Sequence, residues 1–229
     1  LAGIQQIKQL DDSLTSEAAL VQLSDQLAEL HQLMISAPRE FLLVGEEEKL
    51  SAYQQVLNKH FTTIDQPSFQ AFSQPALHEQ IAELWKTSTQ VNFCAKSYPT
   101  VAMSHPDAAA LTVLGGFLRN GYLHRAIREQ GGAYGGGAGQ DSNIAAFRFF
   151  SYRDPRIEGT LDDFDESLRW LQNESHEWSQ VEQAILGVIS SIDKPGSPAG
   201  EAKQTFHTEL YGRTREVREQ FRNQVREVT

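Results

Sequence analysis

The sequence has a single cysteine, Cys94, among its 229 residues. One thiol cannot form an internal disulfide, and a thiolate metal cluster needs several cysteines, so a reducing compartment fits best. Cys94 lies between Phe93 and Ala95, in a stretch that alternates like a strand. We therefore interpret it as a thiol that faces the core or the next layer, and not as a nucleophile.

Basic residues and long apolar runs are also scarce. The chain has 20 Lys and Arg against 30 Asp and Glu, which gives a formal net charge of −10. This charge repels a phosphate backbone, so we expect no nucleic-acid partner. No apolar run approaches the roughly 20 residues of a membrane-spanning helix, and residues 1–10 lack the basic-then-apolar order of a signal peptide. We therefore expect no membrane association.

The motifs of metal and nucleophilic catalysis are missing. None of the seven histidines has a second histidine four residues away, so neither His-Glu-x-x-His nor the inverted His-x-x-Glu-His occurs. His78 is followed by Ala82, and His176 by Gln180, where a second ligand would stand. No Gly-x-Ser-x-Gly elbow is present either. The sequence predicts no metal site and no serine or cysteine nucleophile in this chain.

What the chain does have is the composition of a folded protein, with 40% apolar and 22% charged residues. Apolar side chains spaced three and four apart between Leu20 and Met34 predict that residues 1–36 are helical, with Pro38 as a boundary. The chain begins with Leu1 and is helical almost from its start. We expect it to be part of a longer protein.

Strands and helices follow one another along the rest of the chain. Val91, Phe93 and Ala95 alternate with polar residues, as in a half-buried strand. A capping box of Thr160 and Asp163 would begin one late helix, and Ser175 would cap the next, with Trp178 on its buried face. These elements predict an α+β fold of two layers, in which helices cover one face of a largely antiparallel sheet. In order, the predicted elements are strand 41–45, helix 47–60, a surface loop over 62–75, strand 91–95, helix 106–130, strands 133–142 and 144–152 joined by a hairpin, and helices from 161, over 175–192 and over 201–227.

The most unusual local composition is that of residues 131–139, of which six are glycine. A phosphate-binding loop follows a strand and opens a helix, whereas this segment follows a helix and leads to a strand, so nucleotide binding is disfavoured. Two interpretations remain. The glycines allow close packing or a strand bulge, or they allow an extended peptide to approach the backbone, and the residues alone favour the first.

Two residues beside these glycines could carry chemistry. Arg128 in the last helical turn and Tyr134 just past it can point into one cleft, with forked donors on the first and a neutral hydroxyl on the second. Such a pair suits a carbonyl that becomes an oxyanion. Taken singly, each residue favours a structural role. The segment 151–156 is interpreted as a structural turn, in which Pro155 ends a strand and Arg153 pairs with the residue after it.

Two runs of sequence resemble a known family. Residues 121–135 (GYLHRAIREQGGAYG) and 149–155 (FFSYRDP) resemble the last domain of insulinase-type zinc metallopeptidases of the presequence-protease branch. The segments 41–45 and 90–93 are similar to the opening strands of that domain. The resemblance implies a processing-peptidase-like metallohydrolase fold for residues 38–229, the C-terminal α+β domain, and makes residues 1–36 a helical tail of the preceding, absent domain.

The resemblance also implies a division of labour between two halves of a hinged peptidase. The N-terminal half, absent here, binds zinc through the inverted motif, and the C-terminal half closes over an unstructured peptide. Its Arg and Tyr, which hold and polarise the scissile carbonyl, match Arg128 and Tyr134. The turn residues expected to approach the peptide are Gly131, Gly132, Ala133 and Gly135.

The expected function is therefore the substrate-gripping part of a zinc metalloendopeptidase that degrades short unstructured peptides. By itself the chain should be inactive, and its partners should be the zinc-bearing N-terminal half and the peptide. Two alternatives are a non-catalytic peptide-binding or assembly module of the same fold, and a free-standing subunit that pairs with a separate zinc-bearing chain. A bacterial cytoplasm is the expected location, and a mitochondrial or plastid matrix is the alternative.

Overall fold

A computed structural model describes residues 2–61 and 79–229. The chain divides into two compact units, Leu1–Lys86 and Thr87–Thr229. The division expected at residues 36–38 concerns the domains of a longer protein, and it stays a prediction.

In the first unit, two helices cover Ala2–Ser13 and Glu17–Ser36, which confirms the helical segment expected up to residue 36. The helix α2 begins after Ser16, whose hydroxyl accepts a hydrogen bond from the backbone N–H of Ala19 at 3.2 Å. The predicted helix 47–60 is confirmed as α3. The helices of this unit are α1 (Ala2–Ser13), α2 (Glu17–Ser36) and α3 (Glu47–His60).

The strand predicted over residues 41–45 is wrong. These residues form no strand, and Phe41 and Val44 are 46% and 48% exposed. A strand is stable only when a neighbour satisfies its backbone groups, and no described residue pairs with this run. The loop predicted over 62–75 lies outside the described residues.

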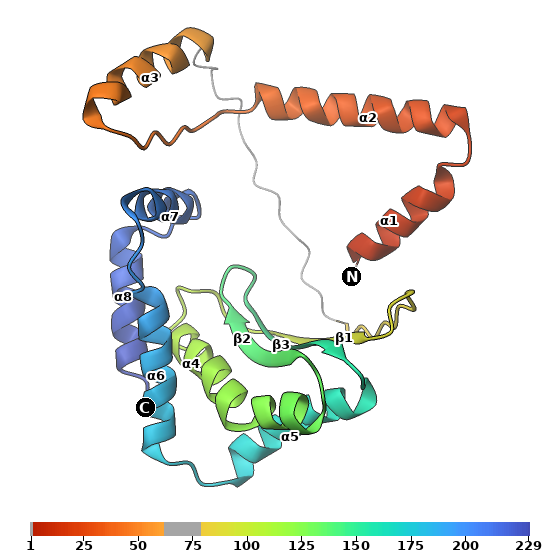
Figure 1. The fold of residues 1–229 in the computed structure, drawn as a ribbon, viewed down its shortest axis with the longest axis vertical. Helices are drawn as coiled ribbons and strands as arrows, with labels where there is room; N and C mark the ends of the chain where they lie inside the picture. Colours follow the sequence, from red (N-terminus) through yellow and green to blue (C-terminus); the bar gives the residue numbers. More distant parts are fainter. Residues whose placement is uncertain (1, 62–78) are drawn as a thin grey trace. The chain divides into compact units, whose positions relative to one another are not determined.

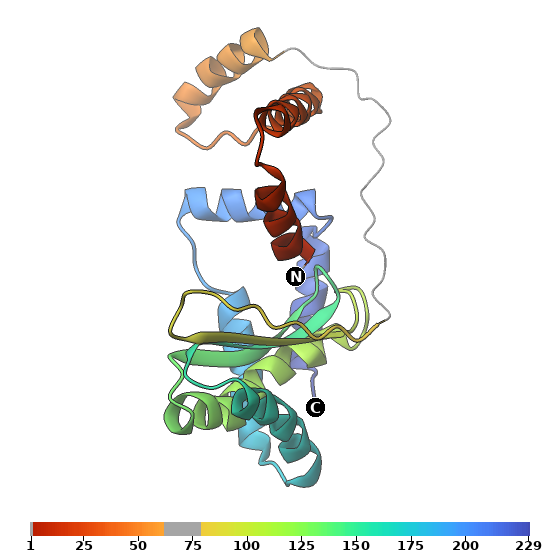
Figure 2. The ribbon, with the colours of Figure 1, turned by 90° about the vertical axis from the view of Figure 1, so that its right-hand side faces the viewer.

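The second unit is built on a three-stranded antiparallel sheet with the order β1-β3-β2. The predicted hairpin is confirmed as β2 and β3. The helices α4, η1 and α5 lie against one face of the sheet (Figures 1 and 2), which confirms the α+β fold with a helix-covered antiparallel sheet. The strands are β1 (Asn92–Pro99), β2 (Gly135–Asp141) and β3 (Ala146–Asp154), and the covering helices are α4 (Ala108–Leu118), the π-helical η1 (Arg119–Gln130) and α5 (Glu158–Asn173).

Two apolar clusters form the core of this unit. The first lies between sheet and helices and centres on Phe149 of β3 and Phe164 of α5, whose ring centroids are 5.4 Å apart. The second joins α4 to α6 and α8, with Val113, Ile185 and Val225 among its members. The remaining helices are α6 (Trp178–Ile192), α7 (Pro198–Leu210) and α8 (Arg215–Arg226).

The strand predicted near residue 93 is present. However, the face expected to be buried, which carries Phe93 and Ala95, is the exposed face. Phe93 is 66% exposed and Ala95 is exposed, whereas Cys94 is buried in the first cluster. The thiol is therefore a core group, as expected, and burial raises its pKa. Phe93 pairs with Tyr152 across the sheet, and both lie on the face opposite Cys94. This second face is the open face of the sheet.

Two predicted helix starts need correction. The helix α5 begins at Glu158 after Ile157, without a side-chain cap, so Thr160 and Asp163 form no capping box. Their side chains are used instead in a network described below. The cap of α6 is a box of Glu177 and Gln180, not Ser175, and the expected buried residue Trp178 is 53% exposed.

Candidate functional site

Arg128 lies on the last turn of η1, where a cation is favoured by the partial negative charge of a helix end. Its backbone carbonyl accepts a hydrogen bond from the N–H of Gly132 at 3.1 Å, while the carbonyl of Ile127 accepts one from Ala133 at 3.1 Å. The side chain of Arg128 is exposed and makes no ion pair or hydrogen bond with any described residue. The helix end is thus fixed through its backbone, and the guanidinium faces solvent.

The glycines after η1 are explained first by packing. Gly132 has φ +80°, a left-handed conformation that suits glycine, and a Cβ on Gly131 would overlap the guanidinium of Arg156. A Cβ on Gly136 would lie 2.9 Å from Ile127. These contacts support the structural interpretation of the segment. Of the predicted peptide-binding residues, Gly131 and Ala133 are buried, Gly132 is exposed and Gly135 is half-buried.

Tyr134 immediately precedes β2, and its side chain is 62% exposed. Its ring lies 5.5 Å from the ring of Tyr152, centroid to centroid. The guanidinium carbon of Arg153 lies 5.5 Å from the centroid of the Tyr134 ring, and the Tyr134 N–H donates to the Arg153 carbonyl at 3.2 Å. Tyr134 therefore lies on the open side of the sheet, with its ring in contact with the side chains of Tyr152 and Arg153 of β3.

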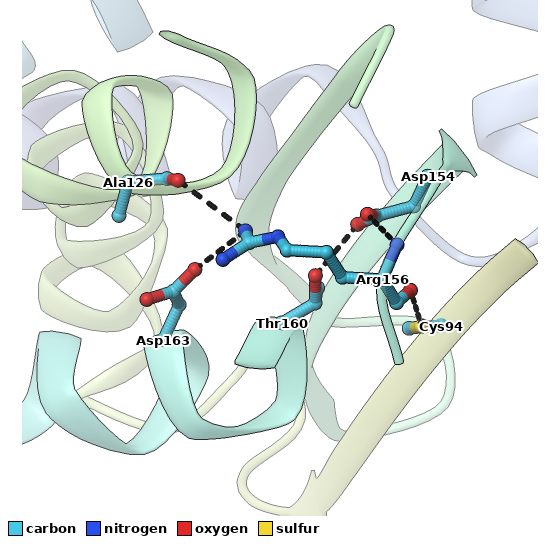
Figure 3. Close-up of polar contacts among 6 residues, drawn as sticks. All are labelled: Cys94, Ala126, Asp154, Arg156, Thr160 and Asp163. Atoms are coloured by element: carbon cyan, nitrogen blue, oxygen red, sulfur yellow. Dashed lines mark hydrogen bonds and ion pairs between the residues drawn. The ribbon is translucent and has the colours of Figure 1, made fainter. Parts of the chain in front are cut away.

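A buried polar network lies between the end of β3, the start of α5 and η1 (Figure 3). Asp154 is completely buried, and its carboxylate accepts hydrogen bonds from the N–H of Arg156 at 2.9 Å and from the hydroxyl of Thr160 at 2.8 Å. The guanidinium of Arg156 donates to Asp163 at 2.8 Å and to the carbonyl of Ala126 at 3.3 Å. The network thus joins the end of β3 and the start of α5 to η1, the helix that carries Arg128.

The predicted local pair of Arg153 and Asp154 is wrong. Asp154 is engaged by Arg156 and Thr160 inside the core, while Arg153 lies over the ring of Tyr134. Arg128 and Tyr134 flank the same turn and are both exposed. Their joint action on one carbonyl stays a prediction.

The described residues offer no metal site. No group of three or more His, Cys, Asp or Glu side chains within 2–61 and 79–229 is placed to hold an ion. The zinc ion implied by the family resemblance therefore does not fit the residues of this part of the chain. Among the described helices, none has both the length and the apolar character needed to cross a bilayer.

The family described as the PreP C-terminal domain matches residues 82–229. The chain belongs to this family. The resemblance seen in the sequence, to the presequence-protease branch of the zinc metallopeptidases, is confirmed.

Curated relatives of this PreP C-terminal domain chain are named mitochondrial presequence protease. One from Yarrowia lipolytica is 31% identical over 234 residues, which cover 100% of this chain and 23% of that protein. One from Kluyveromyces lactis is 40% identical over 141 residues, which cover 61% of this chain and 14% of that protein. The chain thus spans less than a quarter of the length of these relatives.

Solved structures show the same fold for the PreP C-terminal domain chain. The inactive peptidase domain of a protein named as a zinc protease from Bordetella parapertussis matches with a TM-score of 0.51 and 16% identity, covering 60% of this chain and 79% of that one. A second structure, from Bordetella pertussis, matches with a TM-score of 0.50, also at 16% identity, covering 61% and 84%. At this identity the match supports the fold alone.

Sequence reasoning missed the residues that surround Tyr134 in this PreP C-terminal domain. Tyr152 and Arg153 are consecutive and both exposed, although neighbouring residues of a regular strand point to opposite faces. The signal in the sequence is the polar pair Arg153-Asp154 at the end of an aromatic strand, a pattern that by itself indicates only a turn.

Proposed function

We propose that this chain is the substrate-gripping C-terminal part of a zinc-dependent endopeptidase that degrades short unstructured peptides. Membership of the PreP C-terminal domain family carries the proposal. Arg128 and Tyr134 would contact the scissile carbonyl from the side opposite the metal. Zinc, held by the N-terminal half of the longer protein, would supply the activated water.

The setting of the two residues supports this role. The guanidinium of Arg128 is exposed and has no described partner, so its forked donors are available to a carbonyl oxygen. Tyr134 is exposed and its backbone N–H is bonded to the carbonyl of Arg153, so its hydroxyl is accessible to a peptide beside the turn. Donors placed before the reaction cost little reorganisation when negative charge develops on the oxygen.

Partners and location follow from the same family. The proposed partners are the zinc-bearing N-terminal half and an extended peptide, and the chain alone would not hydrolyse peptides because it lacks the metal ligands. The names of the relatives favour the mitochondrial alternative for its location. The bacterial cytoplasm stays a prediction.

Substitutions in the full-length peptidase test the proposal. Arg128→Ala and Tyr134→Phe are each expected to lower the turnover of an unstructured peptide by about 100-fold, the usual loss when one oxyanion donor is removed. Zinc content should be unchanged, because neither residue is a ligand. Arg125→Ala, on the same helix and also exposed, is the matched control and should keep wild-type turnover.

Wild-type turnover in both variants would refute the gripping role. That result would favour the alternative of a non-catalytic module. Loss of zinc from either variant would show that the effect is indirect.

A further inference from the structure

Arg153 has an unusual backbone. Its φ is +51°, in the left-handed region, which glycine adopts freely and a residue with a Cβ adopts at a cost in energy. The only other non-glycine residue with positive φ among those described is Ala145, also at +51°, in the turn between β2 and β3. A tight turn explains Ala145, whereas Arg153 lies inside a strand.

The reason for this conformation is a β-bulge. Asn92 of β1 pairs with Asp154, and the next residue, Phe93, pairs with Tyr152, so Arg153 is an extra residue without a partner on β1. Without the bulge, strict alternation would direct Arg153 toward the helices and Asp154 to the open face. With it, Arg153 joins Tyr152 on the open face and Asp154 returns to the buried network. Bulges of this kind redirect a side chain, and often do so beside functional sites.

The redirected side chain reaches Tyr134. The guanidinium carbon of Arg153 is 5.5 Å from the centroid of the Tyr134 ring, a cation–π contact, and the Tyr134 N–H bonds to the Arg153 carbonyl. No described carboxylate forms an ion pair with Arg153. The contact with the Tyr134 ring is therefore the polar interaction that the Arg153 side chain makes within the described part of the chain.

We propose that Arg153 is a positioning residue, whose guanidinium holds the Tyr134 ring in the orientation from which its hydroxyl meets the peptide. The inference rests on the proposed function, because the bulge matters to catalysis only if Tyr134 contacts the peptide. Glycine would fit the backbone of position 153 with less strain, so the backbone conformation alone does not account for an arginine there. Strain of this kind persists where the surrounding structure requires the conformation, commonly at ligand-binding sites.

A double-mutant cycle in the full-length peptidase tests the inference through activity. Arg153→Gly relieves the backbone and removes the cation, and it should lower kcat/KM for an unstructured peptide by roughly two- to fivefold, the value of an exposed cation–π contact. In a Tyr134→Phe background the same substitution should have no further effect, because Arg153 acts through the Tyr134 hydroxyl. Ala145→Gly, which relieves the same φ at the other end of β3, is the control and should leave kcat/KM unchanged.

The ring itself gives a readout that does not depend on catalysis. With the tyrosines of this chain isotope-labelled, the NMR signal of the Tyr134 ring is assigned by its disappearance in Tyr134→Phe. Arg153→Gly should shift that signal while keeping the urea midpoint at or above that of the wild type, and Ala145→Gly should not shift it.

Each failure has its own pattern. If Tyr134→Phe keeps wild-type turnover, the part of the proposed function that assigns a donor role to Tyr134 is wrong, and the NMR signal alone decides whether Arg153 holds the ring. If Tyr134→Phe is impaired but Arg153→Gly neither lowers kcat/KM nor shifts the signal, the proposed function stands and the positioning role is wrong. Equal losses from Arg153→Gly in both backgrounds would likewise overturn the positioning role, because they would show that Arg153 acts independently of Tyr134.

Discussion

At the scale of single residues, Asp154 is the polar group whose removal should cost most. It is fully buried, and its carboxylate satisfies both the N–H of Arg156 and the hydroxyl of Thr160 (Figure 3). Asp154→Ala would leave both donors buried without an acceptor. We expect a loss of about 3 kcal/mol in the free energy of unfolding, measured by urea denaturation.

The matched control for this prediction is Asp162→Ala. Asp162 is an exposed aspartate one position before Asp163 in α5, so its removal should change the free energy of unfolding by less than about 0.5 kcal/mol. Equal effects of the two substitutions would mean that the network does not stabilise the fold.

The bulge in β3 is the reason that the sequence does not predict which face of the sheet Arg153 occupies. Arg128 and Tyr134 could be selected because the helix, the glycines and the strand occur in an order that brings them to one turn. The face that Arg153 occupies could not be deduced, because a bulge is defined by the register of the partner strand and not by β3 itself. The same limit applies to Phe93, since alternation fixes which residues share a face but not which face is covered.

At the scale of elements, the contact between α4 and β2 depends on a glycine. A Cβ on Gly115 would lie 2.7 Å from the Cα of Gly139, a backbone atom that cannot rotate away. Gly115→Ala should therefore force the helix and strand apart and lower the free energy of unfolding by about 1–3 kcal/mol. Thermal or urea unfolding measures this change.

Gly187→Ala is the control for the same chemistry in an open environment. Gly187 lies inside α6, and a Cβ there would meet nothing within 4 Å. Alanine is the better helix former, so this substitution should raise the free energy of unfolding by roughly 0.5–1 kcal/mol. The packing argument would be contradicted if Gly115→Ala were as stable as Gly187→Ala.

Elements with local signals were predicted well, and those that depend on partners were not. The helix 47–60 and the hairpin of β2 and β3 follow from residue periodicity and from turn residues close in sequence. The run 41–45 has the composition of a buried strand, but a strand also needs a neighbour, which no local pattern supplies. The predicted start of α5 at residue 161 lies three residues too late, because Thr160 has the composition of a helix cap but donates its hydroxyl to Asp154 instead.

At the scale of the whole molecule, the two units differ in how much of their surface is buried. Both apolar clusters lie within Thr87–Thr229, between Cys94 and Val225. In the first unit, α2 and α3 have no buried residue. Because an amphipathic helix gains most of its stability from packing, these two helices should open far more readily than the sheet. Sequence periodicity detects helices in both units equally, so this difference could not be predicted from the sequence.

Hydrogen exchange on the 229-residue chain tests this difference directly. Amides of β3 and α4 should exchange only through global unfolding, because their strand and helix bonds are enclosed by the two clusters. Amides of α2 and α3 should exchange through local opening, with lower protection and little dependence on denaturant. Comparable protection in α2 and β3, with the same denaturant dependence, would show that the first unit unfolds together with the second. The stability of the chain would then depend on packing within residues 1–86 that the burial pattern does not indicate.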